Sequence, residues 1–345
     1  MRPSVNRGVD PFGEQSARPH HRSLQLLGAL FRFESNSARL LQLVDQAFAG
    51  LPRHRLGGRS PRLLVRLQLT TRQQRAAAAA AAPPPLNTYA GPGFLCGAID
   101  QSNLAVISPA QRSALVVVSR DMLRHAYHLR YELIEFAVYV LAARALRLVP
   151  LHAAAVGRQG RGLLLMGDSG AGKSTITLHC LLQGLGLLSE DAVFVAPDGR
   201  AATGIANFLH LQRRGLALLR ARAAVRHIRS SPIIRRRSGV EKYEVDLRRS
   251  GYRLAPAPLS IQALVFLSKR RGSDDRLLVP VAARQRAPRL AALQPYAAGQ
   301  QGWRRFENSL ASVRTYELRR GSHPAVAVAA LRGLLDPPKR SAPRA

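Results

Sequence analysis

The stretch LLLMGDSGAGKSTITLHCLLQGLGLLSEDAVFV, residues 163–195, decides the fold of this chain. Within it, GDSGAGKS at residues 167–174 fits the Walker A pattern G-x-x-x-x-G-K-[ST] at each defined position. An apolar run enters the motif and an apolar, helix-like run leaves it. Glycines in such a loop let backbone N–H groups turn inward around phosphate oxygens at a helix N-terminus. The sequence therefore predicts a strand, a phosphate loop and a helix; the alternative is a glycine turn that binds no nucleotide.

The residues of this loop have separate expected tasks. Lys173 is expected to reach the β- and γ-phosphates of a nucleotide, and the Ser174 hydroxyl is expected to ligate Mg²⁺. The other nucleotide contacts are expected from the rest of the loop and the first turn of the helix, which are Gly167, Asp168, Ser169, Gly170, Ala171, Gly172 and Thr175.

An acidic pair follows at a distance that separates this chain from the commoner phosphate-loop proteins. Glu190 and Asp191 lie 17 and 18 residues after Lys173, which allows one helix of about three turns, a glycine stop and a return of the chain to the loop. The pair precedes the apolar run AVFVA instead of ending a strand. One carboxylate can then hold a metal while the other accepts a hydroxyl proton. The alternative is an acid pair that caps a helix or lies on the surface.

The run LHAAAVGRQGRGLLLMGDSGAGKSTITLHCLLQGLGLLSEDAVFV, residues 151–195, resembles the catalytic domain of bacterial HPr kinase/phosphorylase and its related serine kinases. That family pairs a histidine shortly before the loop with an acidic pair shortly after it. His152, 15 residues before Gly167, falls at the histidine's place. The resemblance is tight over residues 151–197 and softer at 235–248 and 264–268.

The resemblance implies an ATP-dependent protein kinase with ATP and Mg²⁺ as cofactors and a serine of a protein or peptide as the phosphate acceptor. It also implies a division of work at the site. Ser174 and Asp191 would hold the metal, and Lys173 would act on the phosphates. Glu190, with help from His152, would accept the proton of the serine hydroxyl.

Two departures from the family pattern concern the acceptor. The HPr enzyme carries two aspartates where this chain has Glu190 and Asp191, and no copy of its second glycine-rich signature is recognisable, since QRRGLALL at 212–219 is too loose. We therefore expect a related serine kinase that acts on a target other than HPr. The alternative is an ATP-binding regulatory or assembly protein without phosphotransfer.

The expected fold is α/β, with a phosphate-loop kinase domain of the HPr kinase and phosphoenolpyruvate carboxykinase type at residues 95–337. A small α+β domain at 23–94, which ends in an Ala/Pro linker, precedes it. Residues 1–22 and 338–345 are expected to be disordered tails. Helices are expected at 38–48, from about 121 to 146 and at 324–335, and strands at 62–69, 113–119 and 263–268.

The formal charge of +32 suggests a nucleic-acid partner, but only four of the 52 basic residues are lysine. Such arginine use is typical of a GC-rich genome, so we expect no specific nucleic-acid partner. Lysines are informative against this background, because a lysine where arginine is the default suggests that a compact point charge is needed. Lys242 and the cluster Arg235–Arg236–Arg237 are therefore further candidate site residues. No run predicts a membrane span, and the two separated cysteines fit a reducing cytoplasm. A homo-oligomer stays open.

Overall fold

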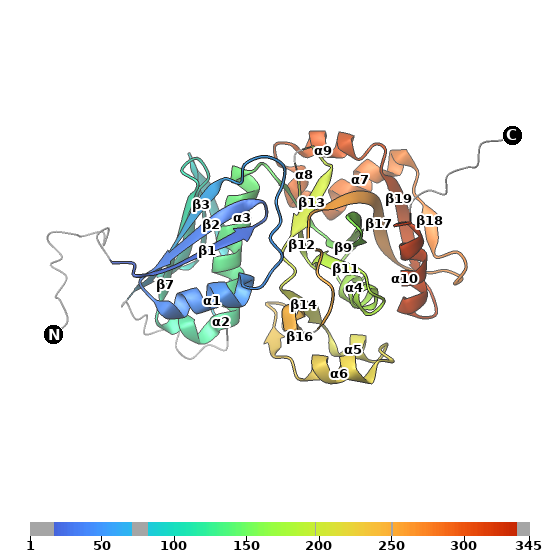
Figure 1. Cartoon of the computed structure of the whole chain (residues 1–345), viewed down its shortest axis with the longest axis horizontal. Coiled ribbons are helices and arrows are strands. Elements are labelled where there is room, and N and C mark those ends of the chain that lie inside the picture. The colour runs from blue at the N-terminus through green and yellow to red at the C-terminus, as the bar shows by residue number, and fades with distance from the viewer. Residues whose placement is uncertain (1–16, 71–81, 197, 250, 337–345) are drawn as a thin grey trace. The chain divides into compact units, whose positions relative to one another are not determined.

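The computed structural model describes residues 17–70, 82–196, 198–249 and 251–336, and it shows a mixed α/β chain. The expected tails at 1–16 and 338–345 lie outside the described residues, as does most of the alanine-rich part of the linker. Contacts divide the chain into two compact units (Figure 1). The first contains the residues up to Leu24, Leu30–Ala49 and Arg62–Leu141, and the second contains Gln25–Ala29, Gly50–Pro61 and the chain from Ala142 onward.

The first unit is built on a seven-stranded sheet in the order β1-β2-β3-β7-β6-β5-β4. Its strands are β1 (His20–Leu26), β2 (Ala29–Ser35), β3 (Arg62–Thr70), β4 (Asn87–Gly91), β5 (Phe94–Asp100), β6 (Asn103–Ser108) and β7 (Ser113–Ser119). Its helical segments are α1 (Ala38–Phe48), a 3₁₀ turn (Asp121–His125), α2 (Ala126–His128), a π-helical segment (Leu129–Glu135) and most of α3 (Phe136–Ala145), whose residues from Ala142 onward belong to the second unit. The helix expected from about 121 to 146 is therefore present as a run of helical segments of changing pitch.

Side-chain alternation explains how the sheet of this unit meets its helices. In β2, Phe31 and Phe33 are fully buried while Arg32 between them is exposed, as the two-residue period of a strand requires. Along α1, apolar residues recur on one helical face and include Phe48. The rings of Phe33 and Phe48 stack with centroids 6.1 Å apart, which joins the helix to the sheet.

The structure differs from the domain boundary expected near residue 94. That position is Phe94, the first residue of β5, and β5 is hydrogen-bonded to β4 in a hairpin. The hairpin continues through β6 into β7, and β7 pairs with β3 in parallel. Backbone pairing therefore keeps residues 95–141 with the first unit. His20–Arg22, expected in a disordered tail, belong to β1.

The second unit is built on a nine-stranded sheet, with β11-β9-β10-β17-β13-β12-β8 in order and β19 and β18 beyond β17. Its strands are β8 (Val149–His152), β9 (Ala154–Arg158), β10 (Arg161–Met166), β11 (Gly186–Ser189), β12 (Ala192–Val195), β13 (Ala201–Gly204), β17 (Leu259–Arg271), β18 (Leu278–Pro280) and β19 (Arg314–Arg320). A second sheet has the order β14 (Phe208–Leu211), β16 (Glu241–Asp246) and β15 (Ile233–Arg235).

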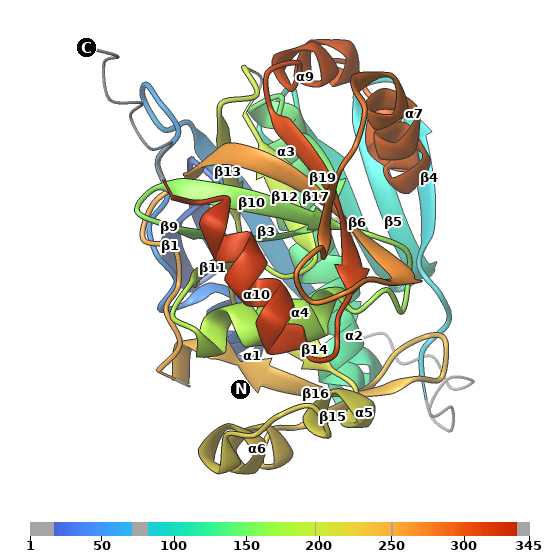
Figure 2. The ribbon, with the colours of Figure 1, turned by 90° about the vertical axis from the view of Figure 1, so that its right-hand side faces the viewer.

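The helices of the second unit are α4 (Lys173–Leu182), α5 (Arg213–Leu216), α6 (Arg222–Arg229), α7 (Ala283–Leu293), α8 (Pro295–Ala298), α9 (Trp303–Ser309) and α10 (Pro324–Gly333), with a 3₁₀ turn at Leu247–Arg249. In Figure 2, α4 and α10 lie together against one face of the large sheet, where they share a core with its strands. No helix in the described ranges is long and apolar enough to cross a membrane.

Burial on both faces explains the apolar run that enters the phosphate loop. Leu163 and Leu165 of β10 face the core of α4 and α10, whereas Leu164 and Met166 face a second core with Leu290 of α7 and the rings of α9. Strands β10, β17 and β19 pair in parallel, an arrangement that is covered on both sides and has continuous apolar sequence. The loop at 167–172 therefore leaves the carboxyl end of a rigid central strand.

A buried histidine holds the segment Gly50–Pro61 in the second unit. His54 Nε2 lies 2.9 Å from the Ala255 carbonyl oxygen, and its Nδ1 lies 2.9 Å from the Thr203 hydroxyl. Because a carbonyl only accepts, Nε2 carries the proton and Nδ1 accepts from the hydroxyl. Burial lowers the pKa of His54, which favours this neutral form, although the bond to Ala255 opposes the shift.

We expect His54→Ala to destabilise the protein by about 1–3 kcal/mol, because it leaves a buried carbonyl and a buried hydroxyl without their partner. The free energy of unfolding in urea measures the effect. Arg53→Ala, at the exposed neighbouring position, is the matched control and should change little. Equal unfolding free energies for the two variants would contradict the anchoring role of His54.

Candidate functional site

The phosphate loop is closed at its base and open at its rim. Gly170 and Gly172 have φ of 77° and 102°, values that glycine adopts without strain. A Cβ added to Gly167 would lie 3.1 Å from side-chain atoms of Ala171 and Leu267, whereas one added to Gly172 would meet nothing within 4 Å. The loop therefore forms a cradle in front of the α4 N-terminus, which fits a phosphate group.

Two arginines that the sequence analysis did not select lie at this rim. The Arg320 Nη2 atom donates to the Gly170 carbonyl oxygen at 3.3 Å. A Cβ added to Gly170 would lie 3.8 Å from Nη2 of Arg214. Of the predicted nucleotide contacts, Asp168 and Ser169 are exposed at the rim and Thr175 is half-buried. The rim thus offers positive charge beside the cradle.

Lys173, His152 and Asp191 form one cluster at the mouth of the loop. The Lys173 Nζ atom lies 2.8 Å from His152 Nε2 and 3.5 Å from Asp191 Oδ1, and His152 Nδ1 lies 3.1 Å from the same carboxylate oxygen. Strand pairing explains this: β8 and β12 are antiparallel with His152 opposite Ala192, so Asp191 arrives beside the histidine. The structure therefore brings together three of the residues that the sequence analysis selected.

The hydrogen bonds of the cluster define the state of His152. An ammonium group only donates, so Nε2 accepts from Lys173 and Nδ1 carries the proton that points to Asp191. Partial desolvation has the largest effect on the pKa of His152 and lowers it, although 60% of the side chain is exposed; Asp191 raises the pKa, while Lys173 also lowers it. The net shift is downward, so the imidazole stays neutral near pH 7.

Glu190 belongs to a second and more deeply buried cluster. The Ser174 hydroxyl donates to Glu190 Oε1. His210 Nδ1 lies 3.4 Å from Glu190 Oε2, and His210 Nε2 lies 3.3 Å from Glu244 Oε1. His210 and Glu244 are register partners in β14 and β16, which is why they meet. The helix N-terminus, the acidic pair and the small sheet therefore join at Glu190.

Charge balance keeps the second cluster ionised. Burial, the largest influence, acts to raise the pKa of Glu190, but the bonds from His210 and Ser174 hold that pKa below its ordinary value. Burial likewise acts to lower the pKa of His210, but Glu190 and Glu244 raise it overall. A charged imidazolium between two carboxylates is consistent with both shifts.

The structure divides the acidic pair differently from the sequence analysis. That analysis placed Asp191 with Ser174 at the metal and Glu190 at the acceptor. In the structure Glu190 contacts Ser174, while Asp191 contacts Lys173 and His152. The Asp191 side chain is 32% exposed and the Glu190 side chain only 6%. The contacts therefore place Glu190, not Asp191, beside Ser174.

Gln294, directly after α7, fixes the backbone of the site histidine. The His152 N–H donates to Gln294 Oε1 at 2.7 Å, and Gln294 Nε2 donates to the His152 carbonyl at 3.0 Å. Gln294 is buried and lies 142 residues from His152 in the sequence. Sequence reasoning missed it, and no local pattern marks it.

Arg236 and Lys242, which the sequence analysis selected, act on the acidic pair. Burial acts to raise the pKa of Asp191, but the charges of His152, Lys173 and Arg236 hold it below its ordinary value. Burial and the charge of Arg236 lower the pKa of Lys242, against the opposing effect of Glu190 and Asp191. Arg236 and Lys242 therefore lie close enough to the acidic pair for electrostatic interaction with it.

Oxygen ligands suitable for Mg²⁺ are present beside the cradle. Within the described residues, no group of three or more His, Cys, Asp or Glu side chains is arranged to hold a metal on its own. Mg²⁺ is usually bound by one or two protein oxygens together with phosphates and water. The Ser174 hydroxyl at the start of α4 and the Glu190 carboxylate that it contacts fit that requirement.

This chain is similar to HPr kinase/phosphorylases. It is 34% identical over 125 residues to the protein of that name from Ralstonia pickettii, which covers 34% of this chain and 37% of the relative. It is 26% identical over 225 residues to the one from Variovorax paradoxus, covering 60% and 63%. It is 43% identical over 86 residues to the one from Burkholderia lata, covering 23% and 25%. The chain thus spans less than two thirds of the length of these relatives, and no protein-family model matches it.

We expect the His210 imidazole to titrate above its ordinary pKa of 6.5, because carboxylates flank both ring nitrogens. Glu244→Gln removes one of them and should lower that pKa. NMR titration of the ring protons measures both values. Glu241→Gln, at an exposed position of the same strand, is the control and should leave the titration unchanged. An equal His210 pKa in the wild type and in Glu244→Gln would contradict the ionised cluster.

Proposed function

We propose that this protein is an ATP-dependent kinase related to HPr kinase/phosphorylase, which transfers the γ-phosphate of Mg·ATP to a serine of a protein or peptide. One observation carries the proposal: Lys173, Ser174 and two carboxylates in different environments meet at a single phosphate loop. The similarity to HPr kinase/phosphorylases supports the same reaction class. We propose a target other than HPr, because the second glycine-rich signature of that family is not recognisable here.

In the proposed site Ser174 and Glu190 hold the metal. Glu190 is already ionised by its bonds to Ser174 and His210, so it can ligate a cation without first losing a proton. His210 is fixed in turn by Glu244, which keeps the carboxylate in position. Mg²⁺ bound there would neutralise charge on the phosphates. The loop N–H groups and the rim arginines would orient the γ-phosphate.

Asp191 is the proposed partner of the acceptor hydroxyl. Its partial exposure lets a serine reach it, whereas Glu190 is buried behind Ser174. The neutral His152 orients the Asp191 carboxylate through Nδ1–H and is itself held by Gln294. Phosphoryl transfer passes through a loose transition state, so orientation and charge neutralisation supply most of the acceleration. A low pKa therefore suits Asp191, which has to position the hydroxyl more than remove its proton early.

Incubation of the purified protein with a bacterial lysate, Mg²⁺ and γ-labelled ATP should label a separate protein or peptide on serine, as identified by mass spectrometry. Lys173→Ala removes the cation facing two phosphates and should weaken ATP binding about 10- to 100-fold, the scale of one or two bonds to a charged group. Labelling should fall at least as much.

Arg229→Ala, at an exposed position of α6, is the control for loss of a positive charge and should bind ATP and label normally. Fast ATP hydrolysis without an acceptor would contradict the kinase proposal. ATP binding without turnover under any condition would favour a regulatory nucleotide-binding protein.

Substitution of Glu190 and substitution of Asp191 should impair different steps. Glu190→Gln should raise the Mg²⁺ concentration needed for ATP binding, since it removes a charged metal ligand. Asp191→Asn should bind Mg·ATP normally but lower kcat by about 10²-fold or more, because the acceptor hydroxyl loses the carboxylate that positions it. Calorimetry and the labelling rate measure these effects, with the exposed Asp198→Asn as control. The opposite pattern would restore the assignment made from sequence, and equal small effects would indicate a surface acid pair.

A further inference from the structure

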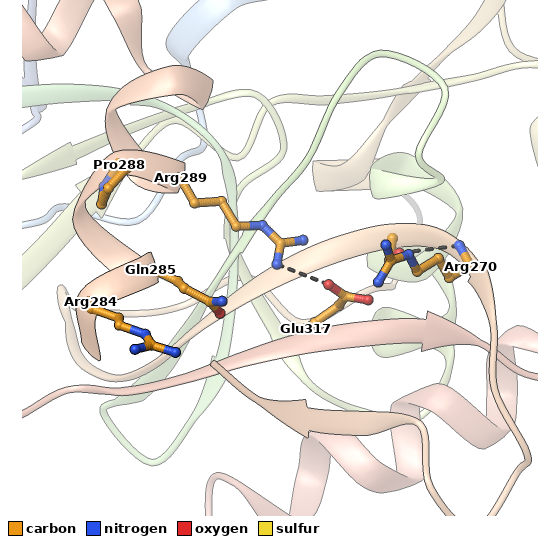
Figure 3. Close-up of a pocket in the computed structure, with 7 residues that line it drawn as sticks. Arg270, Arg284, Gln285, Pro288, Arg289 and Glu317 are labelled. Atoms are coloured by element: carbon orange, nitrogen blue, oxygen red, sulfur yellow. Dashed lines mark hydrogen bonds and ion pairs between the residues drawn. The ribbon is translucent and has the colours of Figure 1, made fainter. Parts of the chain in front are cut away.

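A pocket of about 640 Å³ lies beside α7, apart from the phosphate cradle (Figure 3). Arg284, Gln285 and Arg289 enter it from α7, Ser268 and Arg270 from the end of β17, and Glu317 from β19. In Figure 3 the α7 side chains and Arg270 lie on opposite sides of Glu317. The walls are thus three separate elements of the second unit, and the functional site described above uses none of these side chains.

Positive charge exceeds negative charge among the described residues that line this pocket. Three guanidinium groups face the single carboxylate of Glu317. That carboxylate is already paired, because Arg289 Nη1 lies 2.9 Å from Glu317 Oε2. Arg289 is also held over the Phe266 ring, with its guanidinium 4.6 Å from the centroid. Arg289 and Glu317 therefore form a fixed floor, and the charges of Arg270 and Arg284 are in excess.

The ionised state of Glu317 supports this account. Burial acts to raise its pKa, but the bond and charge of Arg289, a bond from Ser268 and the charge of Arg270 hold that pKa below its ordinary value. The floor of the pocket is therefore a closed ion pair near pH 7. A ligand entering beside it meets the two remaining arginines, whose planar forks suit carboxylate oxygens.

The pocket lies on the same edge of the sheet as the phosphate loop. Leu267 packs against Gly167 at the start of that loop, and Ser268 is the next residue along β17. Strands β10 and β17 are parallel neighbours, about 4.8 Å apart. Ligands of parallel sheets bind at the carboxyl ends of the strands, which is the edge that both sites share.

Helix α7 also links the pocket to the site histidine. Arg289 precedes Gln294 by five residues, about 7.5 Å along a helix. Gln294 holds the backbone of His152 on both sides. A ligand on the pocket face of α7 therefore lies along the element that positions the proposed acceptor site.

We propose that this pocket binds an acidic segment of the polypeptide that accepts the phosphate, through Arg270 and Arg284. The inference rests on the proposed kinase function and adds a substrate class to it: serines accompanied by glutamate or aspartate. A volume of about 640 Å³ is within the range of sites for whole ligands of several groups, which favours a peptide segment over a single ion. Gln285 supplies a neutral hydrogen-bonding group at the same wall.

Fluorescence anisotropy of a labelled peptide, with one serine among four glutamates, tests the pocket directly. A twin peptide carries glutamine at the four positions, and binding is measured without nucleotide at about 150 mM salt, where distant surface charges are largely screened. Wild-type protein should prefer the glutamate peptide. The double variant Arg270→Gln/Arg284→Gln should bind it at least about tenfold more weakly, since two charge-assisted bonds are lost.

The control variant Arg304→Gln/Arg305→Gln removes the same charge from exposed positions of α9 and should bind like wild type. Equal affinity for both peptides, or an equal loss in both double variants, would overturn the proposal. Binding of inorganic phosphate that depends on Arg270 and Arg284, without binding of the glutamate peptide, would also overturn it. Failure of the kinase proposal is separate, because it would appear as absent serine labelling in protein that still binds the peptide.

Discussion

The antiparallel pairing of β8 with β12 is the constraint on which the site depends. It sets His152 opposite Ala192, and Asp191, one residue earlier, then lies beside Lys173 at the start of α4. No local sequence feature could hold these groups together, since 21 residues separate His152 from Lys173. The pairing brings them together because β8 and β12 belong to the same sheet as β10, which leads into the loop and is packed between two cores. The chemistry therefore rests on strand register.

The same turn separates the two acids into different environments. Glu190 and Asp191 form the bend between β11 and β12, where Glu190 contacts Ser174 and His210 on the buried side while Asp191 contacts Lys173 and His152 at the mouth. Burying Glu190 is tolerated because the imidazolium of His210 and the hydroxyl of Ser174 compensate for lost hydration. The contribution of the Glu190–His210 ion pair to stability depends on pH at both ends of its range. It is lost as the pH rises through the raised pKa of His210, and as the pH falls through the lowered pKa of Glu190.

Sequence patterns were sufficient where the structure is local. The phosphate-loop unit was expected as strand, loop and helix, and β10, residues 167–172 and α4 have that order. The helix at 38–48 was also predicted, and it matches α1. Patterns failed where hydrogen bonds between distant segments decide. The boundary near residue 94 was drawn from an Ala/Pro-rich composition, but the hairpin of β4 and β5 crosses it.

The site shows the same division between local and distant signals. Lys173, Ser174 and the acidic pair were found because their spacing is fixed by one loop and one helix. His210, Glu244 and Gln294 carry no such spacing, and each reaches the site through a separate strand or helix. Sequence also could not show which acid contacts Ser174 and which contacts Lys173, because the direction of each carboxylate depends on the bend that precedes β12.

Charge in this protein is informative by its position more than by its total. Only four of the 52 basic residues are lysines. Two of these four lie near the acidic pair: Lys173 is 3.5 Å from Asp191, and the charges of Glu190 and Asp191 influence the pKa of Lys242. A guanidinium at Lys173 would be a wide planar fork where the loop mouth needs a compact charge between His152 and Asp191. At the pocket of α7 the opposite holds, because planar forks that pair with carboxylates are what an acidic segment needs. Within the excess of arginine two local arrangements stand out, a compact cation beside His152 and Asp191 and guanidinium forks at the pocket of α7.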